Sequence, residues 1–282
     1  MKTEHQRRTT ENVIENSKNL MNYNVYKLSA GERIGFSLVG FAIGAIVSYI
    51  FYGGIGKNEY GDATPVTLIC NTIIMCTAGL VTAKVFCSLM TKVLLDNRRK
   101  NLHRQFIDLL DSLSASLSTG QNVPSAFLRA EEDLRVQYPD DSFIVLEVRN
   151  INDGFRNNIE IEKMLVDFGR RSGIKDIANF GKVFETAYRK GGNIRDIVRN
   201  THEILSTKTQ IELEIETKVS ATKNEQNIML VMPVLIVGMI KMMGGDFADK
   251  FTTPNGLLYT TAGIGAFVIA FFIGRSILDI EV

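Results

Sequence analysis

The chain has 282 residues, a formal net charge of +1 and 22% charged residues. This length allows one or two domains, and the lack of a basic excess excludes the charge signature of nucleic-acid-binding proteins, so we expect no nucleic-acid partner. The charged residues are unevenly distributed, because several long stretches contain no Asp, Glu, Lys or Arg.

Four segments are predicted to cross a membrane as helices. Ile34–Gly56, Ala63–Ala83 and Phe251–Gly274 contain no charged residue, and each has the about 20 residues needed to cross a hydrocarbon core of about 30 Å. A further segment, Gln226–Ile240, is shorter. It reaches spanning length only if Lys241 extends its ammonium group to the interface. A buried or re-entrant helix is the alternative for this segment.

Two other features belong to the predicted membrane segments. Cys70 and Cys76 lie inside the second segment, without a CxxC motif or a nearby His, so we expect small apolar residues and no metal or disulfide. Gly40 and Gly44 have the GxxxG spacing that lets membrane helices approach closely. That spacing is compatible with a homo- or hetero-oligomer, although it is common by chance.

Basic residues alternate between the two sides of the predicted segments. They are frequent before the first segment and after the second, and scarce in two short connections, residues 53–62 and 244–254. The positive-inside rule therefore predicts a multi-pass protein with both termini in the cytoplasm. The resulting parts are an N-terminal segment (1–33), a helix pair (34–83), a cytoplasmic domain (84–225), a second helix pair (226–274) and a tail (275–282).

The cytoplasmic domain is predicted to be helical throughout. Apolar residues recur with the helical period from Leu102 to Leu117. Further helices are expected from near Pro124, from Ser142 to Gly154, from Ile159 to Arg171, and up to Lys190. A last helix begins after Asn193, and no Gly or Pro interrupts it before Met232. It is therefore expected to continue into the third membrane segment.

The domain contains two similar stretches. Residues 113–134 align with residues 184–205, so that Gly120 matches Gly191 and Asn122 matches Asn193. Glycine accepts the left-handed backbone that ends a helix, and Asn can cap the next one. The pattern predicts an all-α membrane protein whose six-helix cytoplasmic bundle has two three-helix repeats; chance similarity of helix junctions is the alternative. The residues expected to form structural turns are Gly120, Asn122, Gly154, Gly191, Gly192 and Asn193.

Residues 106–205 resemble the cytoplasmic domain of the GspF/PilC/TadB superfamily, the platform proteins of type II secretion, type IV pili and Tad (Flp) pili. The similar stretches are Leu-Leu-Asp-Ser-Leu at 109–113, Asp153-Gly154 before Met164-Leu165, Arg170-Arg171, and Tyr188-Arg-Lys-Gly-Gly-Asn193. A single domain between two pairs of membrane helices is most similar to the Tad branch, TadB and TadC.

The resemblance implies a platform subunit of the inner (cytoplasmic) membrane. Such a subunit couples a hexameric secretion ATPase to the extraction and assembly of pilin or pseudopilin subunits, beside a second related platform subunit and among membrane lipids. The candidate ATPase-docking residues are Arg170, Arg171, Lys175, Arg189 and Lys190. A solvated helix surface is the alternative for each of them. The alternative function is a membrane signalling or scaffold protein whose helical domain binds another partner.

The sequence lacks motifs that carry chemistry. It has no GxxxxGK[ST] phosphate loop, and His202-Glu203 lacks the second His of a zinc protease motif. No ionisable residue lies deep inside the predicted membrane segments, which disfavours a transporter. We therefore expect a protein that is not an enzyme and that has no cofactor and no metal.

Overall fold

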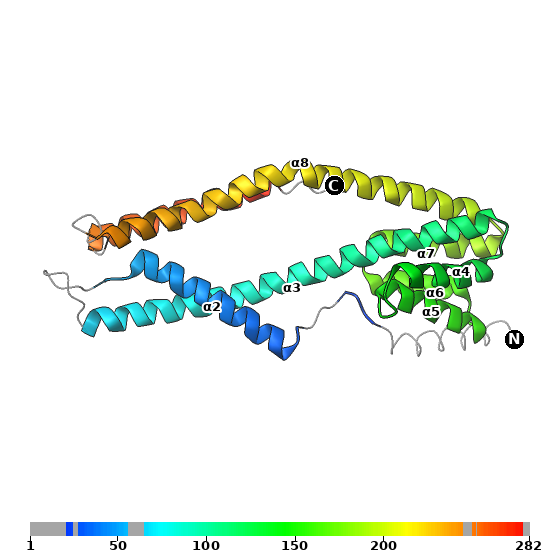
Figure 1. The fold of residues 1–282 in the computed structure, drawn as a ribbon, viewed down its shortest axis with the longest axis horizontal. Coiled ribbons are helices and arrows are strands. Elements are labelled where there is room, and N and C mark those ends of the chain that lie inside the picture. Colours follow the sequence, from blue (N-terminus) through cyan, green and yellow to red (C-terminus); the bar gives the residue numbers. More distant parts are fainter. Residues whose placement is uncertain (1–20, 25–27, 56–64, 245–249, 252, 279–282) are drawn as a thin grey trace. The chain divides into compact units, whose positions relative to one another are not determined.

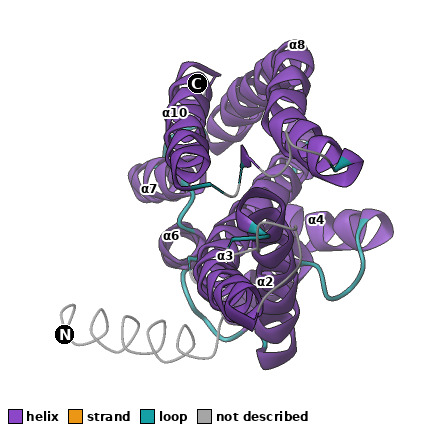
Figure 2. Ribbon diagram, turned by 90° about the vertical axis from the view of Figure 1, so that its left-hand side faces the viewer, coloured by secondary structure: helices purple, strands orange, loops and turns teal. Residues whose placement is uncertain are grey.

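The structure is a computed structural model that describes residues 21–24, 28–55, 65–244, 250–251 and 253–278. These residues form α-helices joined by short turns, and none of them lies in a β-strand (Figures 1 and 2). The chain divides into two compact units. The helical domain contains residues 21–24 and 92–211, and the membrane unit contains the described residues of 28–91 and 212–278. The all-α fold class predicted from the sequence is confirmed.

Four helices are long and apolar enough to cross a membrane: α2 (Ala30–Tyr52), α3 (Pro65–Ser118), α8 (Ile194–Met243) and α10 (Pro254–Leu278). Each overlaps one of the four predicted segments, and α8 contains the whole of Gln226–Ile240. Of the predicted segments, residues 56, 63, 64 and 252 lie outside the described residues. The helix α3 has 54 residues and α8 has 50, so each continues from one unit into the other without a break. The third membrane segment is therefore part of a continuous helix, not a separate re-entrant one.

The helix α2 begins earlier and ends earlier than predicted. The Ser29 N–H donates to the Glu32 carboxylate at 2.9 Å, and this cap brings Glu32 and Arg33 into the first turn. At the other end the Gly53 N–H donates to the Tyr49 carbonyl at 2.8 Å and closes the helix. The predicted segment is defined by the absence of charged residues, so it leaves out Glu32 and Arg33. This explains why α2 begins earlier than predicted.

The GxxxG face of α2 packs against α3 of the same chain. A Cβ on Gly40 would lie 2.8 Å from Phe86 Cβ, and a Cβ on Gly44 would overlap the Thr82 side chain. The Thr82 hydroxyl donates to the Gly40 carbonyl at 3.0 Å across this contact. The Gly40 and Gly44 face, whose spacing is compatible with an oligomer, is thus covered by α3 of the same chain. Small residues allow membrane helices to pack this closely.

Lys241, which is expected to extend to the interface, contacts the end of α2. Its Nζ donates to the carbonyl oxygens of Phe51 at 3.1 Å and Gly53 at 3.0 Å. These carbonyls end α2, where the helix dipole is negative and the acceptors lack partners within the helix. A lysine at the end of α8 therefore caps α2.

The helical domain contains α4 (Val123–Gln137), α5 (Phe143–Arg156), α6 (Ile161–Ser172) and α7 (Lys175–Lys190), together with the adjoining parts of α3 and α8. The predicted stripe of α3, from Leu102 to Leu117, is buried in one core with the rings of Phe127, Phe168 and Phe184. Val198 and Leu205 complete this core from α8. Its division into two three-helix repeats stays a prediction.

The two Gly-x-Asn junctions have the same local geometry. Gly120 and Gly191 have positive φ angles of 89° and 69°. The Asn122 side chain accepts from the Ser125 N–H at 2.9 Å, and the Asn193 side chain accepts from the Asp196 N–H at 3.4 Å. The Gly192 N–H donates to the Ala187 carbonyl at 2.8 Å.

Gly154 requires a correction, because it does not form a turn. It lies inside α5, which continues to Arg156. A Cβ at this position would overlap the Met164 side chain of α6. The glycine therefore allows α5 and α6 to pack closely, and the chain turns later, at Asn157 and Asn158, the latter with a φ of 61°.

Candidate functional site

The structure divides the five candidate docking residues into an exposed group and one buried residue. Arg170, Lys175, Arg189 and Lys190 are exposed, whereas Arg171 is only 7% exposed. Arg171 therefore cannot contribute to a docking face. Neighbouring residues of an α-helix point about 100° apart, so Arg170 and Arg171 have opposite environments despite their adjacency.

The four exposed residues do not form a single patch. Arg170 at the end of α6 and Lys175 at the start of α7 flank one connection, whereas Arg189 and Lys190 lie at the far end of α7. The 16 residues of α7 correspond to a length of about 24 Å. We name the two groups the 170/175 patch and the 189/190 patch.

Acidic neighbours reduce the charge of both patches. Arg189 pairs with Glu185 at 3.2 Å and with Glu160 at 3.4 Å, and Arg170 pairs with Asp167 at 2.5 Å. The exposed pairs of Arg189 contribute between about 0 and 1 kcal/mol to stability, so a partner could displace them at low cost. Asp167, by contrast, is only 7% exposed, so its pair with Arg170 is partly buried. Two small basic patches are therefore available for binding an acidic surface.

Arg171 lies in a buried ion-pair network between α5 and α6. Its Nη1 and Nη2 atoms donate to the two carboxylate oxygens of Glu147 at 2.7 and 2.6 Å, and its Nε donates to Asp167 at 2.7 Å. All three side chains are at most 8% exposed. The fork of the guanidinium matches the carboxylate, which lysine could not reproduce.

This network binds the segment that precedes the first membrane helix. Tyr23 is 1% exposed, and its hydroxyl donates to the Glu147 carboxylate at 2.8 Å. Its ring packs edge-on against Phe143, with ring centroids 5.4 Å apart. The Tyr23 N–H donates to the Arg171 carbonyl at 3.0 Å, and Arg171 Nη1 donates to the Met21 carbonyl at 3.2 Å. We call residues 21–24 the N-terminal anchor.

Asn24 fixes the other end of the anchor. Its side-chain amide donates to the Arg170 carbonyl at 3.3 Å, and its side-chain oxygen accepts from Arg99 at 2.9 Å. Asn24 occupies the space in which a side chain at Gly173 would lie, and Gly173 has a φ of 66°. A glycine is therefore needed here both for the left-handed backbone and for the close approach of the anchor.

Burial and charge shift the protonation equilibria of the anchor. Burial, and then the charge of Glu147 and the hydrogen bond to it, raise the pKa of Tyr23 well above its usual range. Burial lowers the pKa of Arg171, but the hydrogen bonds and charges of Glu147 and Asp167 outweigh it, so the net direction is upward. The phenol thus stays neutral and the guanidinium stays charged.

The arrangement holds the N-terminal anchor against α5 and α6. Within the described part of the chain, no three His, Cys, Asp or Glu side chains lie close enough together to hold a metal ion. Comparison with protein-family models, with curated proteins and with solved structures gives no match.

Sequence reasoning missed the N-terminal anchor, because its contacts join residues that are 124 positions apart and it lies in a polar segment without a motif. The burial of Arg171, by contrast, could have been predicted from the helical spacing of the apolar residues around it. Ile161, Leu165, Phe168 and Ser172 form the buried stripe of α6, and Arg171 falls on the same face, four residues after Asp167.

Proposed function

We propose that this chain is a platform subunit of a pilus or secretion machine in the cell membrane, most similar to the Tad branch. It couples a hexameric cytoplasmic ATPase to the extraction and assembly of pilin or pseudopilin subunits. The observation that carries the proposal is the direct helical connection of the domain to the membrane unit through α3 and α8.

An uninterrupted helix is a suitable mechanical connection. Its backbone hydrogen bonds hold every residue to the one four positions away, whereas a Gly-rich linker would absorb a displacement as disorder. No Gly or Pro occurs in α3 from Leu80 to Ser118, or in α8 from Ile194 to Met232. A displacement of the domain by a partner is therefore transmitted along two membrane helices.

The charge distribution supports an accessible cytoplasmic domain. Basic residues are concentrated before α2 and at the start of the domain, which places both termini and the domain on the cytoplasmic side by the positive-inside rule. A soluble ATPase would meet the helical domain there. The 170/175 patch and the 189/190 patch would each offer the ATPase a separate contact. Arg171 is buried and instead positions the N-terminal anchor.

The decisive experiment measures binding of the full chain to its secretion ATPase by pull-down, with one patch reversed at a time. The pair Arg170→Glu and Lys175→Glu tests the 170/175 patch, and the pair Arg189→Glu and Lys190→Glu tests the other. Loss of binding with either pair identifies the docking patch. The matched control reverses Arg129 and Arg156, which are 58% and 67% exposed on α4 and α5.

Equal ATPase binding by both variants and the control would contradict docking through these patches. The platform role itself is tested in cells, where deletion of the gene should abolish assembly of the pilus or secretion of its substrate. A deletion strain that keeps both functions would favour the signalling or scaffold alternative.

A further inference from the structure

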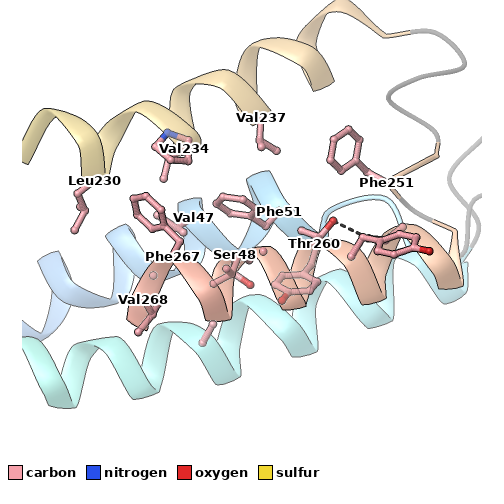
Figure 3. Close-up of a pocket in the computed structure, with 18 of the residues that line it drawn as sticks. Val47, Ser48, Phe51, Leu230, Val234, Val237, Phe251, Thr260, Phe267 and Val268 are labelled. Carbon is pink, nitrogen blue, oxygen red and sulfur yellow. Dashed lines mark hydrogen bonds between the residues drawn. The ribbon is translucent and has the colours of Figure 1, made fainter. Parts of the chain in front are cut away.

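The membrane unit contains a large apolar groove. It has a volume of about 880 Å³ and is lined by residues of α2, α3, α8 and α10, well within the range of about 300–1,000 Å³ typical of ligand sites. Figure 3 shows Val234 and Val237 of α8 facing Phe51 of α2 and Phe267 of α10 across it. All of these helices are membrane-spanning candidates, so the groove lies at the depth of lipid.

The polar atoms in the wall of the groove are largely satisfied by protein. The Thr82 hydroxyl donates to the carbonyls of Gly40 and Ala78, and the Thr260 hydroxyl donates to the Gly256 carbonyl. The Tyr52 hydroxyl bonds to Thr261. The Ser48 hydroxyl, which also lines the groove, is buried without a hydrogen-bond partner among the described residues. The wall is therefore mainly suited to methylene groups, with the Ser48 hydroxyl as a single point of polar contact.

One end of the groove has a different character. Lys250, Phe251, Tyr52 and Tyr259 line it where α2 ends and α10 begins. The Lys250 side chain is exposed at this end. Lysine and aromatic residues at helix ends are typical of the level of lipid headgroups. This end is suited to a phosphate, while the rest of the groove is suited to hydrocarbon.

The packing of the membrane unit argues against a partner's membrane helix as the occupant. The surface that would admit another helix closely, at Gly40 and Gly44, is already covered by α3. An acyl chain, by contrast, is a single file of methylene groups.

We propose that this groove is a binding site for a membrane phospholipid, with one acyl chain between α2, α8 and α10 and the headgroup phosphate at Lys250. The lipid belongs to the leaflet that contains the α2–α3 and α8–α10 connections. This site is independent of the proposed platform function, and its failure would leave that function untouched.

The chain offers a matched pair of variants for the test. A Cβ at Gly263, which lines the groove, or at Gly265, which does not, meets no atom within 4 Å. Both glycines lie in α10, so Gly263→Leu fills the groove while Gly265→Leu adds the same side chain elsewhere on the same helix. Neither substitution forces a clash in the fold.

The full chain is reconstituted into phosphatidylcholine vesicles that contain a phospholipid with a photoreactive acyl chain, and labelled peptides are mapped by mass spectrometry. We expect the label on groove residues of α8 and α10, reduced about tenfold by Gly263→Leu and unchanged by Gly265→Leu. Equal labelling of both variants would overturn the site.

A second probe, a photoreactive diacylglycerol without phosphate, tests the headgroup contact. It should label the native chain about tenfold less than the phospholipid does, and Lys250→Gln should remove this difference. Equal labelling by the two probes in the native chain would overturn the role of Lys250. If Gly263→Leu instead changed the oligomeric state without any lipid label at the groove, a helix of a second copy would be the occupant and the lipid proposal would be wrong.

Discussion

The helical domain contains a buried ionic network, whereas several hydroxyls of the membrane unit bond within their own helix. In the domain, Glu147, Asp167 and Arg171 bond to one another across two helices. In the membrane unit, the hydroxyls of Thr72 and Thr77 donate to carbonyls one turn earlier in the same helix. A hydroxyl with a local acceptor is satisfied in lipid whatever its helix packs against. The domain network, by contrast, exists in only one packing arrangement.

Neighbouring helices are therefore aligned by different interactions in the two units. Buried ionic contacts align α5 and α6, whereas steric fit at Gly40 and Gly44 aligns α2 with α3. We therefore expect the domain to be most sensitive to the loss of a charge and the membrane unit to be most sensitive to added volume.

The largest effect is expected from Arg171→Met in the domain. The substitution leaves Glu147 and Asp167 buried without their cation, and breaking one partner of a buried pair costs about 3–5 kcal/mol. Hydrogen exchange of α5 and α6 in the full-length protein measures the loss. The control is Arg156→Met on α5, whose side chain is 67% exposed and pairs with the exposed Asp153, and whose removal should cost under about 0.5 kcal/mol. Similar protection in the two variants would show that the network does not stabilise the domain.

An intermediate effect is expected from added volume in the membrane unit. Gly44→Leu places a side chain into Thr82, and overpacking of this kind costs about 1–3 kcal/mol. Gly35→Leu on the same helix meets nothing within 4 Å and serves as the control. Thermal unfolding of the purified protein should show a lower midpoint for Gly44→Leu alone. A normal midpoint would mean that α2 and α3 do not pack through this stripe.

The smallest effect concerns the N-terminal anchor, and it depends on pH. The pKa of Tyr23 is raised in the folded protein, so its contribution is complete below the ordinary tyrosine value of about 10 and is lost as the pH rises above that value. At neutral pH, Tyr23→Phe removes one hydrogen bond and should cost about 1 kcal/mol. Limited proteolysis of the anchor should show faster cleavage in this variant.

The same tyrosine is accessible to spectrophotometric titration. Burial, together with a hydrogen bond to Asp108, raises the pKa of Tyr138 to about 12, so at least two of the eight tyrosines should ionise late. Tyr138→Phe should remove one phenol that titrates near pH 12. Tyr23→Phe should leave the curve unchanged, because the buried phenol stays neutral over that range. Loss of a phenol that titrates near the ordinary value of about 10 in Tyr23→Phe would exclude the buried state of this side chain.

The sequence predicted what depends on local pattern. Windows without charge located the membrane helices, and the absence of Gly and Pro predicted the continuity of α8. It could not predict what depends on long-range contact. The burial of Tyr23, the separation of Arg170 from Arg189 and the role of Gly154 all follow from which helices meet. Hydropathy also missed the Ser29–Glu32 cap, because a charged first turn looks like the end of a membrane segment.

The contact of Lys241 with the end of α2 has a consequence for the order of assembly. Its acceptor on Phe51 precedes it by 190 residues, and a ribosome needs about 10–40 s to add that number. During that interval Lys241 is not yet present to donate to the carbonyls that end α2. The whole helical domain is synthesised before this contact can close, so the capping of α2 by Lys241 is among the last steps in building the membrane unit.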